Sequence, residues 1–99
     1  MFNAVDNSVY AVQQELTAQY GPFLRHRHVA EVLDVSPESL RNTLRRSRQA
    51  NVVYLGLNKL RFGRRIRYTA KCVAEALVLD GHELERRMKE SDAGGSDND

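Results

Sequence analysis

The side chains best suited to chemistry in this 99-residue sequence are arginines, and they are concentrated in the middle of the chain. Residues 25–71 carry twelve basic residues, most of them arginine, against three acidic ones. Their net charge of +9 lies between a segment of −2 (1–24) and a segment of −5 (72–99). The planar guanidinium group pairs with phosphates and with guanine edges through two hydrogen bonds at once. This pattern therefore predicts a polyanionic partner, nucleic acid first among them.

The residues that could support catalysis or bind a metal are few and poorly spaced. Cys72 stands beside an apolar position and is expected to pack in the core, while His26 and His28 fall on different faces of a helix. His82 follows a glycine in an acidic stretch, and no triad, paired carboxylates or phosphate-binding glycine loop is present. We therefore expect no enzymatic activity, no metal site and no cofactor.

The elements that must position the arginines begin with a helix over 7–20. Its apolar residues recur every three or four positions, and Gly21-Pro22 ends it. The recurring residues are Val5, Val9, Val12, Leu16 and Tyr20. This stripe predicts packing against the domain's own core, with a dimer interface as the alternative.

Two further helices are predicted at 26–33 and from Pro37 to about Arg48. Ser36 is suited to the N-cap position and Pro37 to the first helical position. A short connection between helices of this length is typical of a helix-turn-helix. In the second helix Leu40 and Leu44 should face inward. Asp34 stands in the turn, where a left-handed backbone is often needed and aspartate is tolerated.

Residues 49–59 are expected to be irregular or partly extended, with 52–55 as a candidate strand. The alternating stretch 60–68 predicts a β-hairpin. A three-residue loop, 63–65, would pair Phe62 with Ile66 and Leu60 with Tyr68, so that all four face the core.

The remainder of the chain should form a helix at about 70–80 and a helical extension over 81–90. Val73, Ala76, Leu77 and Leu79 are the expected inward residues of the first of these. Residues 91–99 are acidic and small and should be disordered. The expected organisation is an N-terminal helix (1–22), a DNA-binding domain (23–80), the extension (81–90) and the tail (91–99). The expected fold class is mostly α with a small β-hairpin wing.

Three segments in order carry a resemblance to known proteins. They read Val-Ala-Glu-Val-Leu-Asp-Val-Ser-Pro at 29–37, Phe-Gly-Arg-Arg-Ile-Arg-Tyr at 62–68 and Val-Ala-Glu-Ala-Leu at 73–77. Together they resemble the excisionase-like and MerR-type winged helix-turn-helix DNA-binding domains, over a little more than half of the chain. Asp34 replaces the glycine usual there, and the link at 47–59 is longer than is typical.

The resemblance implies sequence-specific binding of double-stranded DNA, with helix 37–48 in the major groove and wing 60–68 on the adjacent backbone or minor groove. The residues predicted to read bases are Glu38, Arg41, Asn42 and Arg45. The residues predicted to contact phosphates, or DNA through the wing, are Arg25, Arg27, Arg46, Arg48, Arg61, Arg64, Arg65 and Arg67.

The implied role is a small cytoplasmic transcriptional regulator, a repressor first, of a plasmid, phage or other mobile element. The alternatives are an excisionase-type architectural factor in recombination and, from another class, a protein–protein interaction module. A homodimer or a cooperative assembly on DNA is compatible with this role. No run of apolar residues is long enough for a membrane span, so no membrane partner is expected.

The acidic tail could compete with DNA for the basic segment. Deleting residues 91–99 should then tighten DNA binding at low salt, measured by fluorescence anisotropy on a labelled duplex. An unchanged dissociation constant would refute this competition.

Overall fold

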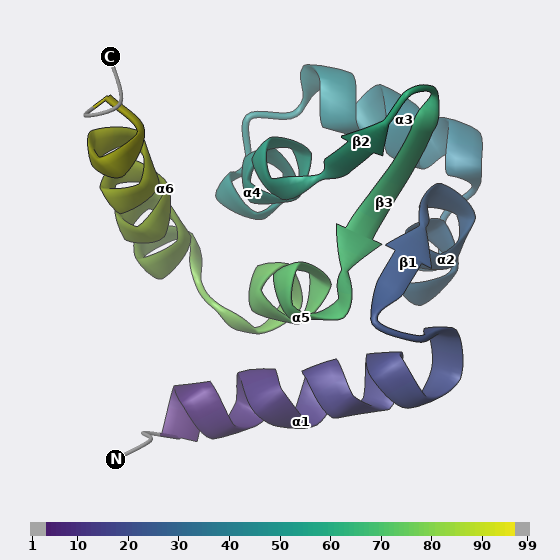
Figure 1. Cartoon of the computed structure of the whole chain (residues 1–99), viewed down its shortest axis with the longest axis horizontal. Coiled ribbons are helices and arrows are strands. Elements are labelled where there is room, and N and C mark those ends of the chain that lie inside the picture. The colour runs from purple at the N-terminus through teal and green to yellow at the C-terminus, as the bar shows by residue number, and fades with distance from the viewer. Residues whose placement is uncertain (1–3, 97–99) are drawn as a thin grey trace.

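The computed structural model describes residues 4–96, with side chains from 7 to 90, as a mostly helical protein with one small sheet (Figure 1). The strands pair antiparallel in the order β1-β3-β2. This architecture is compatible with a winged helical fold. Its elements are α1 (Ala4–Tyr20), β1 (Phe23–Arg25), α2 (His26–Val32), α3 (Pro37–Arg46), α4 (Ala50–Asn58), β2 (Leu60–Phe62), β3 (Arg65–Thr69), α5 (Ala70–Val78) and α6 (Gly81–Ser96).

Helix α5 lies at the centre of the core. It follows β3 without a break, and the Thr69 hydroxyl caps it by accepting the Cys72 amide hydrogen bond at 3.0 Å. Most of its side chains are small and buried, so neighbouring elements can approach closely. Helix α1 packs along one side of α5 and α4 packs on another (Figure 1). Cys72 packs inside this core, as the sequence predicts.

One buried carboxylate joins three helices. Glu75 of α5 is 5% exposed and accepts a 2.7 Å hydrogen bond from the Tyr54 hydroxyl of α4. Arg87 of α6 donates to its other oxygen at 2.6 Å and also pairs with Glu83 at 3.0 Å. The pKa of Tyr54 is raised, mainly because the hydroxyl is buried and also because it donates a hydrogen bond to the Glu75 carboxylate. The pairing offsets the desolvation of Glu75, which would otherwise oppose folding.

The N-terminal helix packs on the domain as expected. Val9 and Leu16 are buried and Val12 and Tyr20 are partly buried against the core. The side chain of Val5 lies outside the described residues. Gly21 ends the helix with a φ of +90°, a conformation open to glycine at little cost. None of the described helices is both long enough and apolar enough to cross a membrane.

Two helices, α2 and α3, joined by a short turn are present as predicted, with the expected caps. Asp34 adopts a left-handed φ of +59°, and the Ser36 hydroxyl accepts from the Ser39 amide at 3.0 Å, with Pro37 at the first helical position. Helix α3 ends at Arg46, before the predicted end near Arg48. The reason is local: Ser47 is extended, and its hydroxyl accepts from the Gln49 amide at 3.2 Å.

The prediction of an irregular or extended segment at 49–59 is wrong, because residues 50–58 form helix α4. The β-branched pair at 52–53 suggested a strand. Burial of Tyr54 and Leu55 in the core, together with the bond to Glu75, favours the helix instead. Tertiary packing here overrides a weak local propensity.

The predicted hairpin register is also wrong. The loop has two residues, Gly63-Arg64, and Phe62 pairs with Arg65 while Leu60 pairs with Arg67. Gly63 has a φ of +61°, as expected at the first position of a type II′ turn, whose twist matches that of the strands. The shift turns Phe62 to the solvent, where it is 70% exposed.

Strand β1 was not predicted, and it explains which face of the sheet is buried. Leu24 pairs with Tyr68, and both side chains are almost fully inaccessible to solvent. Alternation along β3 then places Ile66 on the inner face and Arg65 and Arg67 on the outer face. Tyr68 is therefore buried in the core, and Phe62, which pairs with Arg65 on the outer face, is not.

The C-terminal helices differ from the prediction in three details. Helix α5 stops at Val78, and Leu77 is exposed although Leu79 beyond the helix end is buried. Helix α6 begins at Gly81 and continues to Ser96, so the expected end of the extension at 90 is too early and residues 91–96 are helical rather than disordered. Residues 97–99 of the expected disordered tail lie outside the described residues.

Substituting Tyr54→Phe should destabilise the fold by about 1.5–3 kcal/mol, because it removes a hydrogen bond to a buried carboxylate. Tyr10→Phe is the matched control, since that exposed side chain loses the same hydroxyl without a buried partner. Urea unfolding of both variants measures the difference. Equal midpoints for the two would show that the hydrogen bond from Tyr54 to Glu75 contributes no stability.

Candidate nucleic-acid interface

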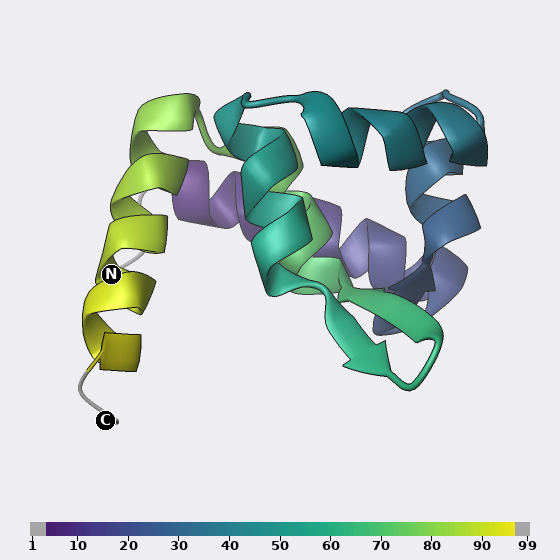
Figure 2. The same ribbon diagram turned by 90° about the horizontal axis from the view of Figure 1, so that it is seen from above.

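A basic hollow of about 660 Å³ lies between α3, α4, the β2–β3 hairpin and the β1–α2 junction. Figure 2 shows the ribbons of α3 and the hairpin lying apart from each other, with α4 on one side and α2 on the other. No acidic residue lines the hollow. Its cationic lining residues are Arg25, Arg27, Arg41, Arg45, Lys59, Arg64, Arg65 and Arg67. The hollow is thus a concentrated site of positive potential.

The orientation of α3 brings its arginines to this hollow. Arg41 and Arg45 are one turn apart and share a face with Leu44, which is partly buried against the core. His26 Nε2 lies 2.8 Å from the Pro37 carbonyl oxygen, a hydrogen bond that joins the start of α2 to the start of α3. This contact and the Ser36 cap fix the N-terminal end of the helix.

The hairpin supplies the opposite wall. Arg64 occupies the loop, and Arg65 and Arg67 follow on β3. The Arg67 guanidinium donates to the backbone carbonyl of Ile66 at 2.9 Å, which restricts its position. Because β3 leads directly into the buried helix α5, the hairpin is anchored to the core at its base.

The positive charges of the hollow have no counterions among the described carboxylates. Glu31 accepts from the Tyr20 hydroxyl at 3.0 Å, and Glu83 is paired with Arg86 and Arg87 of its own helix. No Asp or Glu occurs between Glu38 and Glu75 in the sequence. A site that gathers like charges without compensation is destabilising in itself and attractive to an anion.

The structure brings some predicted DNA-contacting residues together and leaves others apart. Those that line the hollow are Arg25, Arg27, Arg41, Arg45, Arg64, Arg65 and Arg67. Those that lie outside it, all exposed, are Glu38, Asn42, Arg46, Arg48 and Arg61. At 100° per residue Glu38 and Asn42 lie on the solvent side of α3, next to the face that bears Arg41 and Arg45.

Two lining side chains that carry an ionisable nitrogen, Lys59 and His26, were not predicted as contacts. Lys59 is the C-cap of α4, so its place depends on a helix where the sequence predicted irregular or partly extended chain. His26 was considered only as a catalytic or metal-binding residue, but it lines the hollow and bonds to Pro37. The basic run 59–67 was the available signal for Lys59.

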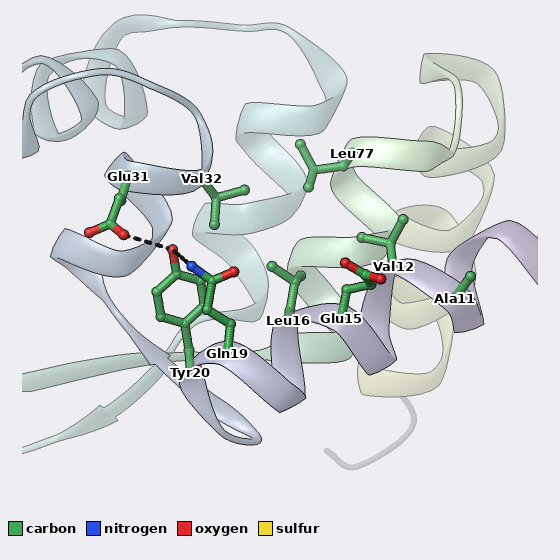
Figure 3. A pocket seen from close by; sticks show the side chains of 9 residues that line it. All are labelled: Ala11, Val12, Glu15, Leu16, Gln19, Tyr20, Glu31, Val32 and Leu77. Atoms are coloured by element: carbon green, nitrogen blue, oxygen red, sulfur yellow. Dashed lines mark hydrogen bonds between the residues drawn. The ribbon is translucent and has the colours of Figure 1, made fainter.

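A second concave surface has the opposite character. It encloses about 570 Å³ between α1, α2 and α5, and Figure 3 shows Val12, Leu16 and Leu77 pointing into it. Its charged residues are Glu15 and Glu31, with no basic side chain. Because phosphate would be repelled here, the basic hollow is the only one of these two surfaces suited to a polyanion.

Cys72 and His28 are held by packing and hydrogen bonds within the fold. Burial raises the pKa of the Cys72 thiol to about 12, which keeps it protonated at neutral pH. His28 stacks on Tyr20, with ring centres 4.7 Å apart, and its Nδ1 accepts from the Arg25 amide at 3.2 Å. Among the described residues no three His, Cys, Asp or Glu side chains gather as metal ligands.

No family model matches the chain, and neither the curated proteins nor the solved structures include one that is significantly similar to it.

Acidification should weaken the fold through His28. Desolvation, together with the charges of Arg27 and Arg25, lowers the pKa of His28, so the native state holds this ring neutral. Its contribution to stability is complete above the unfolded-state pKa near 6.5 and is lost as pH falls through the lower native value. His28→Gln should therefore reduce the drop in urea midpoint between pH 7.5 and 5.5.

The control for this experiment is His82→Gln, which alters an exposed histidine on α6. A His28→Gln variant whose midpoint falls as much as that of wild type over this interval would contradict the prediction.

Proposed function

We propose that this protein binds double-stranded DNA sequence-specifically, with α3 in the major groove and the β2–β3 hairpin on the adjacent backbone or minor groove. The observation that carries the proposal is the basic hollow, which joins Arg45 of α3 and Arg64 of the hairpin on one face. Had these two residues lain on opposite sides of the molecule, one duplex could not have contacted both.

The shape of the hollow suits a phosphate backbone. A sugar–phosphate strand between two grooves is a negatively charged ridge, and the hollow is a positively charged depression flanked by two projecting elements. With the ridge in the hollow, α3 and the hairpin enter the grooves on either side of it. Phosphate contacts of this kind fix orientation and register, and base contacts then supply specificity.

Base reading falls to exposed side chains of α3, both those that line the hollow and those next to it. Arg41 and Arg45 can each form two hydrogen bonds with guanine, and exposed Asn42 can do the same with adenine. Glu38 stands in the first turn, where it favours the positive end of the helix and can also accept from cytosine. Arg46 is the last residue of α3 and Arg48 follows the helix end, where both can bind flanking phosphates.

The biological role is proposed from the resemblance to excisionase-like and MerR-type domains. A small transcriptional regulator, acting as a repressor for a mobile element, is our first assignment, and an architectural factor in recombination is the alternative. A protein–protein interaction module is disfavoured for this face, because the cores of protein interfaces are depleted in charge.

The test is a gel shift with DNA from upstream of the protein's own gene and excess random competitor. Specific retention is expected, and Arg45→Ala should weaken it by about 1–3 kcal/mol and relax one base position. Arg64→Ala should weaken binding to all sequences alike. Arg86→Ala, which alters an arginine paired with Glu83 and Glu90 on α6, is the control and should bind as wild type does.

Salt dependence provides an independent measurement. If about six to ten phosphates are neutralised, affinity should fall about 10³- to 10⁵-fold between 50 and 200 mM salt. Binding that does not respond to salt, or wild-type protein that retains no duplex, would overturn the proposal.

A further inference from the structure

The tip of the hairpin presents an aromatic ring that the fold does not use. Phe62 is 70% exposed, which makes it the most exposed large apolar side chain among the described residues. Its cross-strand partner on the same face is Arg65, and no aromatic contact involves its ring within the part of the chain described. Strand register determines this position, since Tyr68 occupies the core and Phe62 falls on the other face.

The surroundings of Phe62 restrict what could bind it. Its neighbours in sequence include Arg61, Arg64 and Arg65. Gly63 follows Phe62 directly, and a Cβ atom added to this glycine would meet nothing within 4 Å, so the space around the loop is open. A protein partner that buried this ring would also have to desolvate the arginines around it, which interface cores avoid. A ligand that has stacked planar apolar groups flanked by negative charges could contact the ring through the former and the arginines through the latter.

Double-stranded DNA has that combination, and the hairpin tip has suitable dimensions. The minor groove is about 6 Å wide, so side chains at the tip of a two-residue loop can enter it although the paired strands cannot. The negative potential of a narrow minor groove attracts arginine. Apolar side chains that enter this groove insert between base pairs, unstack them and kink the duplex.

We propose that Phe62 is a wedge that inserts between two base pairs in the minor groove beside the α3 site and bends the DNA there. This inference rests on the proposed duplex binding and deepens it. It assigns the ring a role separate from that of the arginines: Arg64 and Arg65 hold the phosphates on either side, and Phe62 opens the step between them. The bound DNA is then deformed as well as recognised, which is what an architectural factor requires.

The experiment uses the full chain and a duplex retained in the gel shift, with 2-aminopurine placed in turn at successive steps beside the α3 footprint. Wild-type protein should raise the fluorescence severalfold at one step, because unstacking relieves quenching. Circularly permuted fragments should report a bend in the range of about 20–90°. In Phe62→Ala both signals should fall to the level of free DNA while the complex still forms.

Three further variants separate the wedge from other effects. Phe62→Leu keeps an apolar side chain and should retain both signals. Phe23→Ala removes a 53%-exposed phenylalanine from β1, on the same sheet but away from the loop, and should also retain them. Arg64→Ala should weaken binding, but the complex that does form should still show the 2-aminopurine signal of base unstacking. Circular dichroism confirms that each variant is folded.

The outcomes distinguish this inference from the proposed function. A wild-type complex without unstacking and without a bend overturns the wedge and leaves duplex binding intact, as does a Phe62→Ala complex that keeps both signals. Wild-type protein that forms no complex with any duplex overturns duplex binding, and the wedge with it.

Discussion

Burial of α5 is the constraint on which the rest of the structure depends. Small side chains let α1 and α4 pack closely around this helix, and its only buried charge, on Glu75, is satisfied by Tyr54 and Arg87. The positions of both walls of the basic hollow depend on α5. The hairpin is joined to α5 through β3, and α3 is held through α4, which packs on α5. A core of this kind fixes the distance between two elements that contact each other little.

Segregation of charge follows from the same packing. Helix α6 pairs its own arginines with Glu83, Glu90 and Glu75, so the charges of Arg86 and Arg87 are neutralised by nearby carboxylates. The arginines of the hollow have no such partners among the described carboxylates, and their mutual repulsion is a cost that the core must offset. This arrangement lowers the stability of the fold and leaves a group of arginines without carboxylate partners. Such a cost is consistent with a site that binds an anionic ligand.

The comparison of sequence with structure separates local from non-local information. Ser36-Pro37, Asp34 and Gly21 each specify a backbone feature within a few residues, and the helix starts and turns they predict are present. The concentration of arginine likewise required no structure. The segment 50–58 and the hairpin register were predicted wrongly because their local patterns are ambiguous. Valines fit a strand or a helix, and alternation fits either of two loops.

What the sequence determined by itself was therefore the caps, the short turn between α2 and α3 and the charge of the central segment, since these depend on neighbours along the chain. Only the tertiary structure decided which arginines share a hollow and which aromatic ring is left outside. Strand β1 pairs with β3 across more than forty residues, and the buried pair Leu24 and Tyr68 settles which face of the sheet turns inward. Because side chains alternate along a strand, that single contact also sends Phe62 into the solvent.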